Sequence, residues 1–261
     1  MASDLIPLTE SVLRRLTNEA LITFLGEAED FEAAGRPGLQ LVLCNEPVAD
    51  MNMLIVGAGA DPGHFREMAS GCLDRELPFL VLIFPEAGDA LDAIAAELGL
   101  VYAVDFPMMV RDDLPLEPQG NPDVDVSRAS GAADADANAD VMVSAYSMPK
   151  ESVLKALPAS LLETPGADVY IARIDGETVG SVTLTYHGDT TGIWAMGTDT
   201  ARQRGGIGMR LLSTAMVEAR NSGARRFFLG ATPAGYRLYE KLGFQDVCAA
   251  RVWVSGETNQ A

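Results

Sequence analysis

The chain has 261 residues, of which 48 % are hydrophobic, and its formal net charge is -18. This apolar content suffices for one large or two small domains. The acidic balance repels nucleic acid and anionic membranes, so we expect neither as a partner, and no run approaches the roughly 18 apolar residues of a membrane span. The N-terminus carries Asp4, Glu10 and Glu19 where a secretion signal would be basic and then apolar, so we expect a cytoplasmic protein.

The acidic charge is concentrated in the first half. Residues 1–126 carry 23 acidic and 6 basic side chains, whereas residues 127–261 carry 14 and 13. The nearly neutral second half can therefore hold a polyanionic ligand. We interpret the acidity of the first half as a solubility feature or an adaptation to salt, in preference to a funnel for cations.

The few cysteines and histidines disfavour several kinds of site. Cys44, Cys72 and Cys248 are odd in number and far apart, which indicates reduced, structural thiols. His64 and His187 are the only histidines, so a histidine-rich metal centre is impossible and a Ser-His-Asp triad is disfavoured. We expect no metal site.

Hydrophobic periodicity predicts the elements of the first half in chain order. They are strands at Leu39–Cys44 and Met53–Val56, a helix at Pro62–Glu76, a strand at Phe79–Phe84, a helix at Asp89–Leu98 and an extended segment at Val101–Val110. The proline-rich stretch from Leu114 to Pro122 cannot continue a helix or a central strand, so it predicts a linker. We therefore divide the chain into domains 1–122 and 123–261.

The second half reads as strand, two helices, three strands, helix, strand, helix and strand. The elements are Val124–Arg128, Asp134–Tyr146, Lys150–Leu162, Val169–Ile174, Thr178–Tyr186, Ile193–Thr198, residues 207–221, Arg226–Leu229, Ala234–Leu242 and Gln245–Val254. Asp175-Gly176 between the second and third strands is a strong hairpin signal. This order predicts a mixed α/β sheet.

A glycine-rich turn connects the strand Ile193–Thr198 to the helix that follows it. The turn is Gln203-Arg204-Gly205-Gly206-Ile207-Gly208. Free amides and the positive end of the helix dipole converge there, and glycines admit a phosphate close to the main chain. Arg202, Arg204 and Arg210 would add side-chain cations. The sequence predicts an anion site, although a G-x-G alone is also typical of a tight turn or helix cap.

Two ordered motifs carry a family resemblance. The pattern Q-x-x-G-x-G and, about 35 residues later, Leu238-Tyr239-Glu240-Lys241-Leu242-Gly243-Phe244 together resemble the GNAT (GCN5-related N-acetyltransferase) superfamily. The resemblance extends over nearly all of the second half. It implies a GNAT fold with acetyl-CoA as cosubstrate and transfer of an acetyl group to a primary amine of a small-molecule or protein acceptor. The first half lacks the loop, although Glu97-Leu98-Gly99-Leu100 echoes the second motif, so we interpret it as a degenerate GNAT-like lobe of a tandem protein.

The resemblance also assigns roles by position. The backbone of Met196, Gly197 and Thr198 would bind the pantetheine arm and the thioester carbonyl, and glycine in a strand is a bulge signal that fits the parting of the strand at Gly197. Tyr239 would be the general acid, and Thr232 stands where the family often has a pantetheine-binding asparagine. The diphosphate would bind the loop residues Gln203, Arg204, Gly205, Gly206, Ile207 and Gly208.

The resemblance leaves the general base open. The strand Ile193–Thr198 contains no acid; Asp199, His187 and Asp189 lie nearby in the sequence but are weak candidates, and a chain of water molecules could serve instead.

The second half also ends one strand early for the family, because only Gln245–Val254 follows the second motif. We expect the segment Pro107–Arg111 of the first half to cover or pair with the resulting edge, since an exposed edge invites aggregation.

Two alternative functions remain. A non-catalytic acyl-CoA sensor or partner-binding protein would keep the fold, and the missing base favours it. A dinucleotide-dependent oxidoreductase is suggested by Gly57, Gly59 and Gly63 after a strand, but Pro62 interrupts that loop. The acceptor amine, the acyl-chain preference, homo-oligomerisation and any ligand of the first half stay open.

Overall fold

The computed structural model describes residues 7–112 and 114–256. Asp4, the start of the first predicted domain and the end of the second lie outside the described residues. The first half forms α1 (Glu10–Leu25), β1 (Glu32–Arg36), β2 (Leu39–Leu43), η1 (Ala49–Met51), β3 (Asn52–Val56), α2 (Pro62–Leu73), β4 (Leu80–Ile83), η2 (Pro85–Ala87), α3 (Ala90–Glu97) and β5 (Val101–Arg111). Sequence analysis assigned no element to α1 or to β1. The β1 residues are all exposed and do not alternate.

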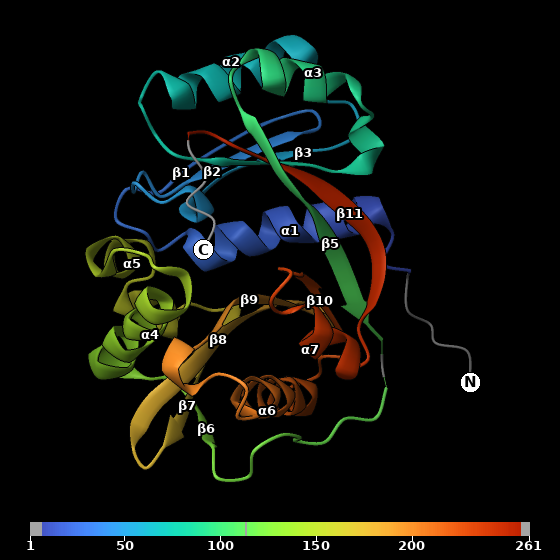
Figure 1. The fold of residues 1–261 in the computed structure, drawn as a ribbon. Helices are drawn as coiled ribbons and strands as arrows, with labels where there is room; N and C mark the ends of the chain where they lie inside the picture. Colours follow the sequence, from blue (N-terminus) through green and yellow to red (C-terminus); the bar gives the residue numbers. More distant parts are fainter. Residues whose placement is uncertain (1–6, 113, 257–261) are drawn as a thin grey trace.

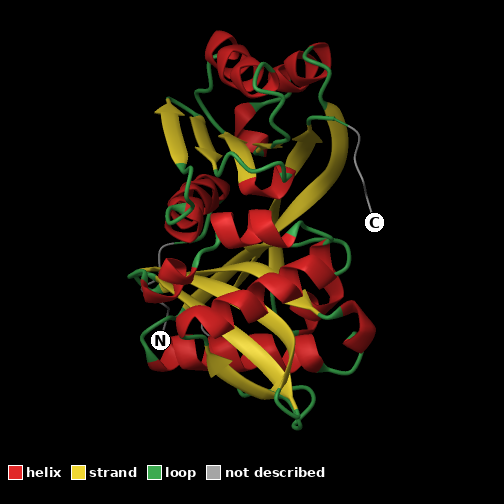
Figure 2. Cartoon of the chain, turned by 90° about the vertical axis from the view of Figure 1, so that its left-hand side faces the viewer, coloured by secondary structure: helices red, strands yellow, loops and turns green. Residues whose placement is uncertain are grey.

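The second half continues the same sheet. Its elements are β6 (Asp125–Arg128), α4 (Gly131–Tyr146), α5 (Lys150–Ala156), η3 (Ala159–Glu163), β7 (Ala167–Ile174), β8 (Glu177–His187), β9 (Thr190–Thr198), η4 (Thr200–Arg202), α6 (Ile207–Asn221), β10 (Arg226–Gly230), α7 (Tyr236–Lys241) and β11 (Gln245–Val254). The described strands form one mixed sheet in the order β1-β2-β3-β4-β11-β5-β10-β9-β8-β7-β6. Figure 1 and Figure 2 show the helices around this sheet. No described helix is both long and apolar enough to cross a membrane.

Two long strands are shared between the halves. β5 pairs with β10 of the second half from Arg111↔Phe227 to Met108↔Gly230. The chain's last strand, β11, pairs along β5 and also with β4 of the first half, from Arg251↔Ile83 to Val254↔Leu80. Figure 1 shows both strands crossing from one half to the other. The expected pairing of the 107–111 segment with the second half is confirmed.

The parallel strands of the first half stay together along their length. β3 pairs with β4 from Met53↔Leu80 to Val56↔Ile83, and Phe84 N–H then donates to Val56 O at 2.9 Å. Beyond the strand ends, the Arg14–Glu86 ion pair lies against the Cα of Gly57. The space in which a ligand could part these strands is therefore filled by side chains.

After the G-x-G turn of the first half, the N-terminus of α2 is capped by a side chain of the protein itself. The Asp61 carboxylate caps α2 by accepting from His64 N–H at 3.0 Å. A carboxylate at this helix N-terminus opposes a pyrophosphate, which would need the same amides. This geometry disfavours the oxidoreductase alternative.

The helix α1 of the first half covers the sheet of the second half. Phe24 stacks on Trp194 of β9 with ring centroids 6.4 Å apart, and a Glu19 carboxylate oxygen lies 3.8 Å from Nδ1 of the half-buried His187 of β8. In Figure 1, α1 runs between the two halves. The halves therefore share a hydrophobic core as well as strands.

One predicted helix is wrong in length. The single helix expected at Lys150–Leu162 ends at Ala156, and the short 3-10 helix η3 follows. Pro158 has no N–H to donate, and its ring pushes Leu157 out of the helical region, to φ -124° and ψ 66°. The chain therefore turns at this point.

Removing the first half should expose both the outer edge of β10 and all of β11. We predict that residues 123–261 expressed alone aggregate, because β10 loses its partner β5, whose Met109 is fully buried against the second half. Size-exclusion chromatography beside the full chain checks this. A soluble, monomeric fragment would contradict it.

Candidate functional site

The strands β9 and β10 separate partway along the sheet. They pair in parallel at Arg226↔Thr190, Phe227↔Thr191 and Phe228↔Gly192, and no later pair joins them in the described chain. We call the unpaired stretch, Ile193–Thr198 of β9 facing Leu229–Gly230 of β10, the splay. The far edge of β10 remains bonded to β5. The splay therefore offers main-chain groups of β9 without leaving β10 unsupported.

A bulge in β9 lies at the splay. Thr183 pairs with Trp194 and Ser181 with Gly197, so two residues, Ala195 and Met196, oppose one residue of β8. Ala195 adopts φ 45°, which a non-glycine residue rarely does. The bulge was expected at Gly197 and falls just before it. Such irregularities re-aim main-chain and side-chain groups at functional sites.

Gly197 has a packing role instead. A Cβ there would lie 2.9 Å from Ala145 Cβ and 3.1 Å from Val141 Cγ1, so only glycine lets α4 approach β9 this closely. Asp199 N–H donates to Val179 O of the β8 side at 2.9 Å. Main-chain groups of alternate residues face the same edge of a strand, so the N–H and C=O of Gly197 point to β8 as the N–H of Asp199 does. The main-chain groups of Met196 and Thr198 point to the other edge, at the splay.

The predicted anion loop begins a helix as expected. Arg204 and Gly206 adopt left-handed φ values of 66° and 75°, and α6 starts at Ile207. Arg210 N–H donates to Gly206 O at 3.1 Å as the first bond of the helix, so the amides of residues 207–209 precede its hydrogen-bond ladder. The loop from Arg202 to Gly206 is exposed. The turn therefore presents its amides as an anion cradle requires.

The glycines of the loop are needed for close approach. A Cβ on Gly208 would lie 3.2 Å from Met196 Cε and 3.5 Å from Leu238 Cδ2, between β9 and α7. A Cβ on Gly206 would lie 3.1 Å from Asn121 N. Glycine at these two positions therefore avoids close contacts of the loop with the linker, β9 and α7.

The three nearby arginines differ in their surroundings. Arg202 donates to Glu177 Oε2 at 2.7 Å. The Arg204 side chain belongs to the exposed loop, and Arg210 Nε is buried with no acceptor among the described residues. Of the three, Arg204 is therefore placed best to meet an anion at the loop.

The two tyrosines of α7 point in different directions. Tyr239 is buried, and its hydroxyl lies 3.9 Å from Met196 Sδ at the splay. Burial raises the pKa of Tyr239 to about 12. Tyr236 instead donates to Asp246 Oδ2 of β11 at 2.7 Å. Only Tyr239 therefore reaches the bulge.

Thr232 begins the turn before α7 and is exposed. Its hydroxyl accepts from Gly235 N–H at 3.3 Å, and its carbonyl accepts from the amides of Gly235 and Tyr236 at 3.0 Å each. The hydroxyl thus already serves the turn, and binding a ligand would require it to share that contact.

The three acid-base candidates all have structural partners. Asp199 caps η4 through Ala201 N–H and accepts from Ser144 Oγ, each at 3.0 Å. Asp189 pairs with Arg226 at 3.0 Å. His187 is half-buried, and this partial burial lowers its pKa. Asp189 and His187 also stand at the far end of β9, roughly 20 Å from the bulge along the strand.

Sequence analysis missed one residue at the splay, Tyr146. It ends α4, is 39 % exposed, and donates from its hydroxyl to Met196 O at 2.6 Å. Surrounding protein raises its pKa, with smaller contributions from Tyr239 and Asp50. No motif marks this residue, because its position depends on how α4 packs on β9.

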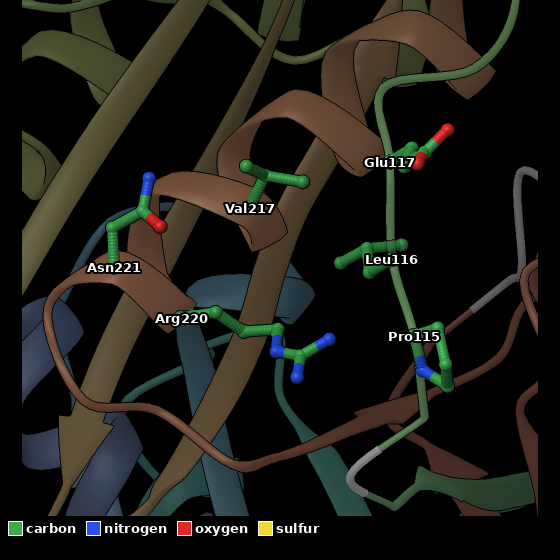
Figure 3. Close-up of a pocket in the computed structure, with 6 residues that line it drawn as sticks. All are labelled: Pro115, Leu116, Glu117, Val217, Arg220 and Asn221. Atoms are coloured by element: carbon green, nitrogen blue, oxygen red, sulfur yellow. The ribbon is translucent and has the colours of Figure 1, made fainter.

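The linker runs along α6 and reaches the anion loop. Gln119 N–H donates to Ser213 Oγ at 2.8 Å, and Asn121 N–H to Gly206 O at 3.4 Å. An open cavity of about 420 Å³ lies between the linker and α6. Figure 3 shows its lining residues, Pro115, Leu116, Glu117, Val217, Arg220 and Asn221. This cavity lies apart from the splay. Within residues 7–112 and 114–256, no cluster of three His, Cys, Asp or Glu side chains could hold a metal ion.

Comparison with known proteins identifies a domain in the second half of the chain. Residues 165–246 match the family model described as "Acetyltransferase (GNAT) domain". No curated protein sequence matches the chain. The matched region includes β8, β9, the anion loop, α6, β10 and α7, which together build the splay.

Several solved structures share the fold over nearly the whole chain. A GCN5-related N-acetyltransferase from Kribbella flavida has a TM-score of 0.70 at 18 % identity, covering 95 % of this chain and 96 % of its own. A similar enzyme from Sphaerobacter thermophilus gives 0.61 at 15 % identity, covering 84 % and 76 %. A tandem GNAT protein from the clavulanic acid biosynthesis pathway gives 0.57 at 14 % identity, covering 97 % and 99 %. The chain therefore contains a GNAT domain at residues 165–246 and has the GNAT fold over nearly its whole length.

Proposed function

We propose that the protein is an N-acetyltransferase that moves an acetyl group from acetyl-CoA to a primary amine. The observation that carries this proposal is the convergence of three features on one point: the amides at the start of α6, the parted strands β9 and β10, and the Tyr239 hydroxyl at the bulge. Each matches one need of the reaction, namely diphosphate binding, main-chain contact with the acyl arm, and a proton donor.

The geometry supports the following assignment of the residues that would hold acetyl-CoA. The loop Gln203–Gly208 would bind the diphosphate through its amides and Arg204. Met196 and Thr198 would bond to the arm and the thioester carbonyl, because their main-chain groups face the splay; Gly197 would act through its missing side chain. Thr232 would sit beside the arm. When bound, acetyl-CoA supplies the activated acyl group.

Proton transfer would depend on Tyr239. Burial holds its pKa near 12, so the phenol stays neutral across the physiological range and keeps a proton to donate to the departing sulfur. Asp199 caps η4 and Asp189 pairs with Arg226, so neither carboxylate is available as a base. A chain of water molecules would then deprotonate the amine.

The division of labour between the halves is also a proposal. Residues 123–261 would form the catalytic domain, and residues 1–122 a degenerate lobe without a coenzyme of its own. The closed β3–β4 pair and the Arg14–Glu86 ion pair support this. We further propose that the protein works in the cytoplasm.

A non-catalytic acyl-CoA-binding protein is the second candidate. It is favoured by the strand Ile193–Thr198, which contains no carboxylate that could act as a base. This alternative shares the coenzyme site and differs only in turnover. A panel of amines monitored by released thiol separates the two, because a sensor would bind acetyl-CoA and release none.

Charge introduced into the loop should abolish coenzyme binding. Gly206→Glu and Gly208→Glu place a carboxylate where the diphosphate would bind, and we expect the Kd for acetyl-CoA to rise at least about 100-fold. Isothermal titration calorimetry measures this. Gly176→Glu is the control, since Gly176 also has a positive φ of 83° but nothing within 4 Å of an added Cβ. Unchanged affinity in both loop variants would refute the assigned loop.

The linker should support the loop. A Cβ on Gly120 would lie 2.5 Å from Gly206 O and 2.7 Å from Arg210 N, so Gly120→Val must displace the start of α6. We expect acetyl-CoA affinity to fall about 10-fold, or roughly 1.4 kcal/mol. Gly131→Val is matched in backbone strain, with φ 71°, and meets nothing. Equal affinities of the two variants would show that the linker does not position the loop.

Tyr239→Phe should slow the reaction without weakening coenzyme binding. Loss of a general acid lowers kcat about 100-fold, and the acetyl-CoA Kd stays near the wild-type value because the ring remains. Tyr236→Phe, which loses only the bond to Asp246, is the control. Steady-state kinetics from pH 7 to 10 provide the test, and equal kcat values for both variants would remove Tyr239 from the mechanism.

A further inference from the structure

The bulge of β9 has a conformation that its own residues do not favour. Ala195 has a φ of 45°, and a residue with a Cβ rarely adopts this left-handed value. The ladders on either side do not fix the next residue, since the pairings of β9 with β8 and β10 in the described chain pass over Met196. A strained backbone of this kind persists only where surrounding contacts hold it. Contacts from outside the ladders are therefore needed here.

The C-terminal end of α4 supplies such contacts. The Tyr146 hydroxyl donates to Met196 O at 2.6 Å, directly after the left-handed Ala195. One position earlier in the helix, Ala145 packs on the main chain of β9, because a Cβ on Gly197 would lie only 2.9 Å from Ala145 Cβ. Two consecutive residues of α4 thus contact two consecutive residues of the strand just after the bulge.

The same end of α4 is anchored to the chain beyond β9. Ser144 Oγ donates to Asp199 Oδ1 at 3.0 Å and accepts from Thr200 N–H at 3.1 Å. Ser144 and Tyr146 therefore contact the chain on opposite sides of Gly197. The position of the Tyr146 hydroxyl is set by the docking of the whole helix end, although 39 % of the residue is exposed.

The bond from Tyr146 bears on the amide of the same residue of β9. The main-chain groups of Met196 face the splay, and its N–H belongs to the peptide unit that joins it to Ala195. The direction of this N–H therefore depends on the left-handed conformation of Ala195. An N–H group directed at a carbonyl oxygen stabilises the charge that develops on that oxygen during acyl transfer, provided that its direction is fixed in advance.

We propose that Tyr146 is a positioning residue for acyl transfer, which holds Met196 O so that the bulge stays left-handed and the Met196 N–H points at the thioester carbonyl of acetyl-CoA. This role rests on the proposed acetyltransferase function. Tyr146 acts through Met196 and not through the loop Gln203–Gly208, so its hydroxyl should affect the thioester and the rate more than the affinity for the coenzyme.

Four variants of the full chain test this role beside the wild type. Tyr146→Phe removes the hydroxyl and keeps the ring. Tyr102→Phe is the matched control, because Tyr102 is 45 % exposed and lies six residues before the first residue of β5 that pairs with β10, or roughly 20 Å along the strand. Ala195→Gly lets the bulge adopt its φ without strain, and the fourth variant combines Tyr146→Phe with Ala195→Gly.

Three measurements are made on each protein. Calorimetry gives the Kd for acetyl-CoA. Isotope-edited infrared spectroscopy of carbonyl-labelled acetyl-CoA gives the stretching frequency of the bound thioester, which falls when an N–H group donates to its oxygen and needs no acceptor amine. Thiol release with tyramine and spermidine gives kcat. Thermal unfolding of Tyr146→Phe should match that of Tyr102→Phe.

The wild type should lower the thioester frequency relative to free acetyl-CoA. Tyr146→Phe should lose at least about half of this shift and lower kcat about 10-fold, while the Kd changes less than about twofold. Tyr102→Phe should match the wild type in all three measurements. The double variant should regain part of the lost shift and rate, since glycine at position 195 needs less support from the tyrosine.

The outcomes separate this role from the proposed function. A wild type that does not bind acetyl-CoA overturns both. If the wild type binds it, equal frequencies for Tyr146→Phe and Tyr102→Phe overturn only the positioning role, whether or not either amine is acetylated. A Kd that rises as much as kcat falls, or a double variant that regains neither shift nor rate, also overturns it, because Tyr146 would then not act by holding the bulge.

Discussion

The pairing of β5 with β10 is the interaction on which the site depends. β10 leaves β9 after Phe228, which gives up ladder hydrogen bonds on one edge. Its other edge is satisfied by β5 from Met108 to Arg111, and Ala231 N–H continues the contact to Pro107 O at 2.8 Å. Since unpaired main-chain groups cost free energy, a strand that parts on one side needs a firm partner on the other. The first half supplies that partner.

The two halves differ in how their parallel strands are paired. The first half keeps its parallel pair closed and fills the adjoining space with Arg14 and Glu86. It also contributes β5, which pairs with β10 of the second half, and Phe106 of β5 packs on Gly230 at the end of β10, where any Cβ would collide with its ring. The first half thus keeps its parallel strands paired and the second half carries the splay, and strands of both halves form one sheet.

Local motifs predicted the parts of the site that depend on adjacent residues. The helix expected from residue 207 starts at Ile207, and Tyr239, which the family resemblance singled out, lies with its hydroxyl 3.9 Å from Met196 Sδ. The pairing of Pro107–Arg111 was predicted by counting strands, because a missing edge partner must come from elsewhere in the chain.

Other features escaped prediction because they arise from contacts between distant segments. Tyr146 reaches Met196 through the packing of α4 on β9, and Asn52 orders the loop before β3 by bonding to main-chain groups as distant in sequence as Pro78. The bulge at Ala195 is set by the register of β8, which no single strand reveals. A spacing pattern along one segment carries no information about such neighbours.

The most direct test of the central claim is a crystal structure of the full chain grown with acetyl-CoA. We expect the diphosphate within hydrogen-bonding distance of the amides of Gly206, Ile207 and Gly208, with the acyl arm running between β9 and β10 toward Tyr239. A coenzyme bound at any other place on the protein would contradict the assignment of this loop and splay as the site of acyl transfer.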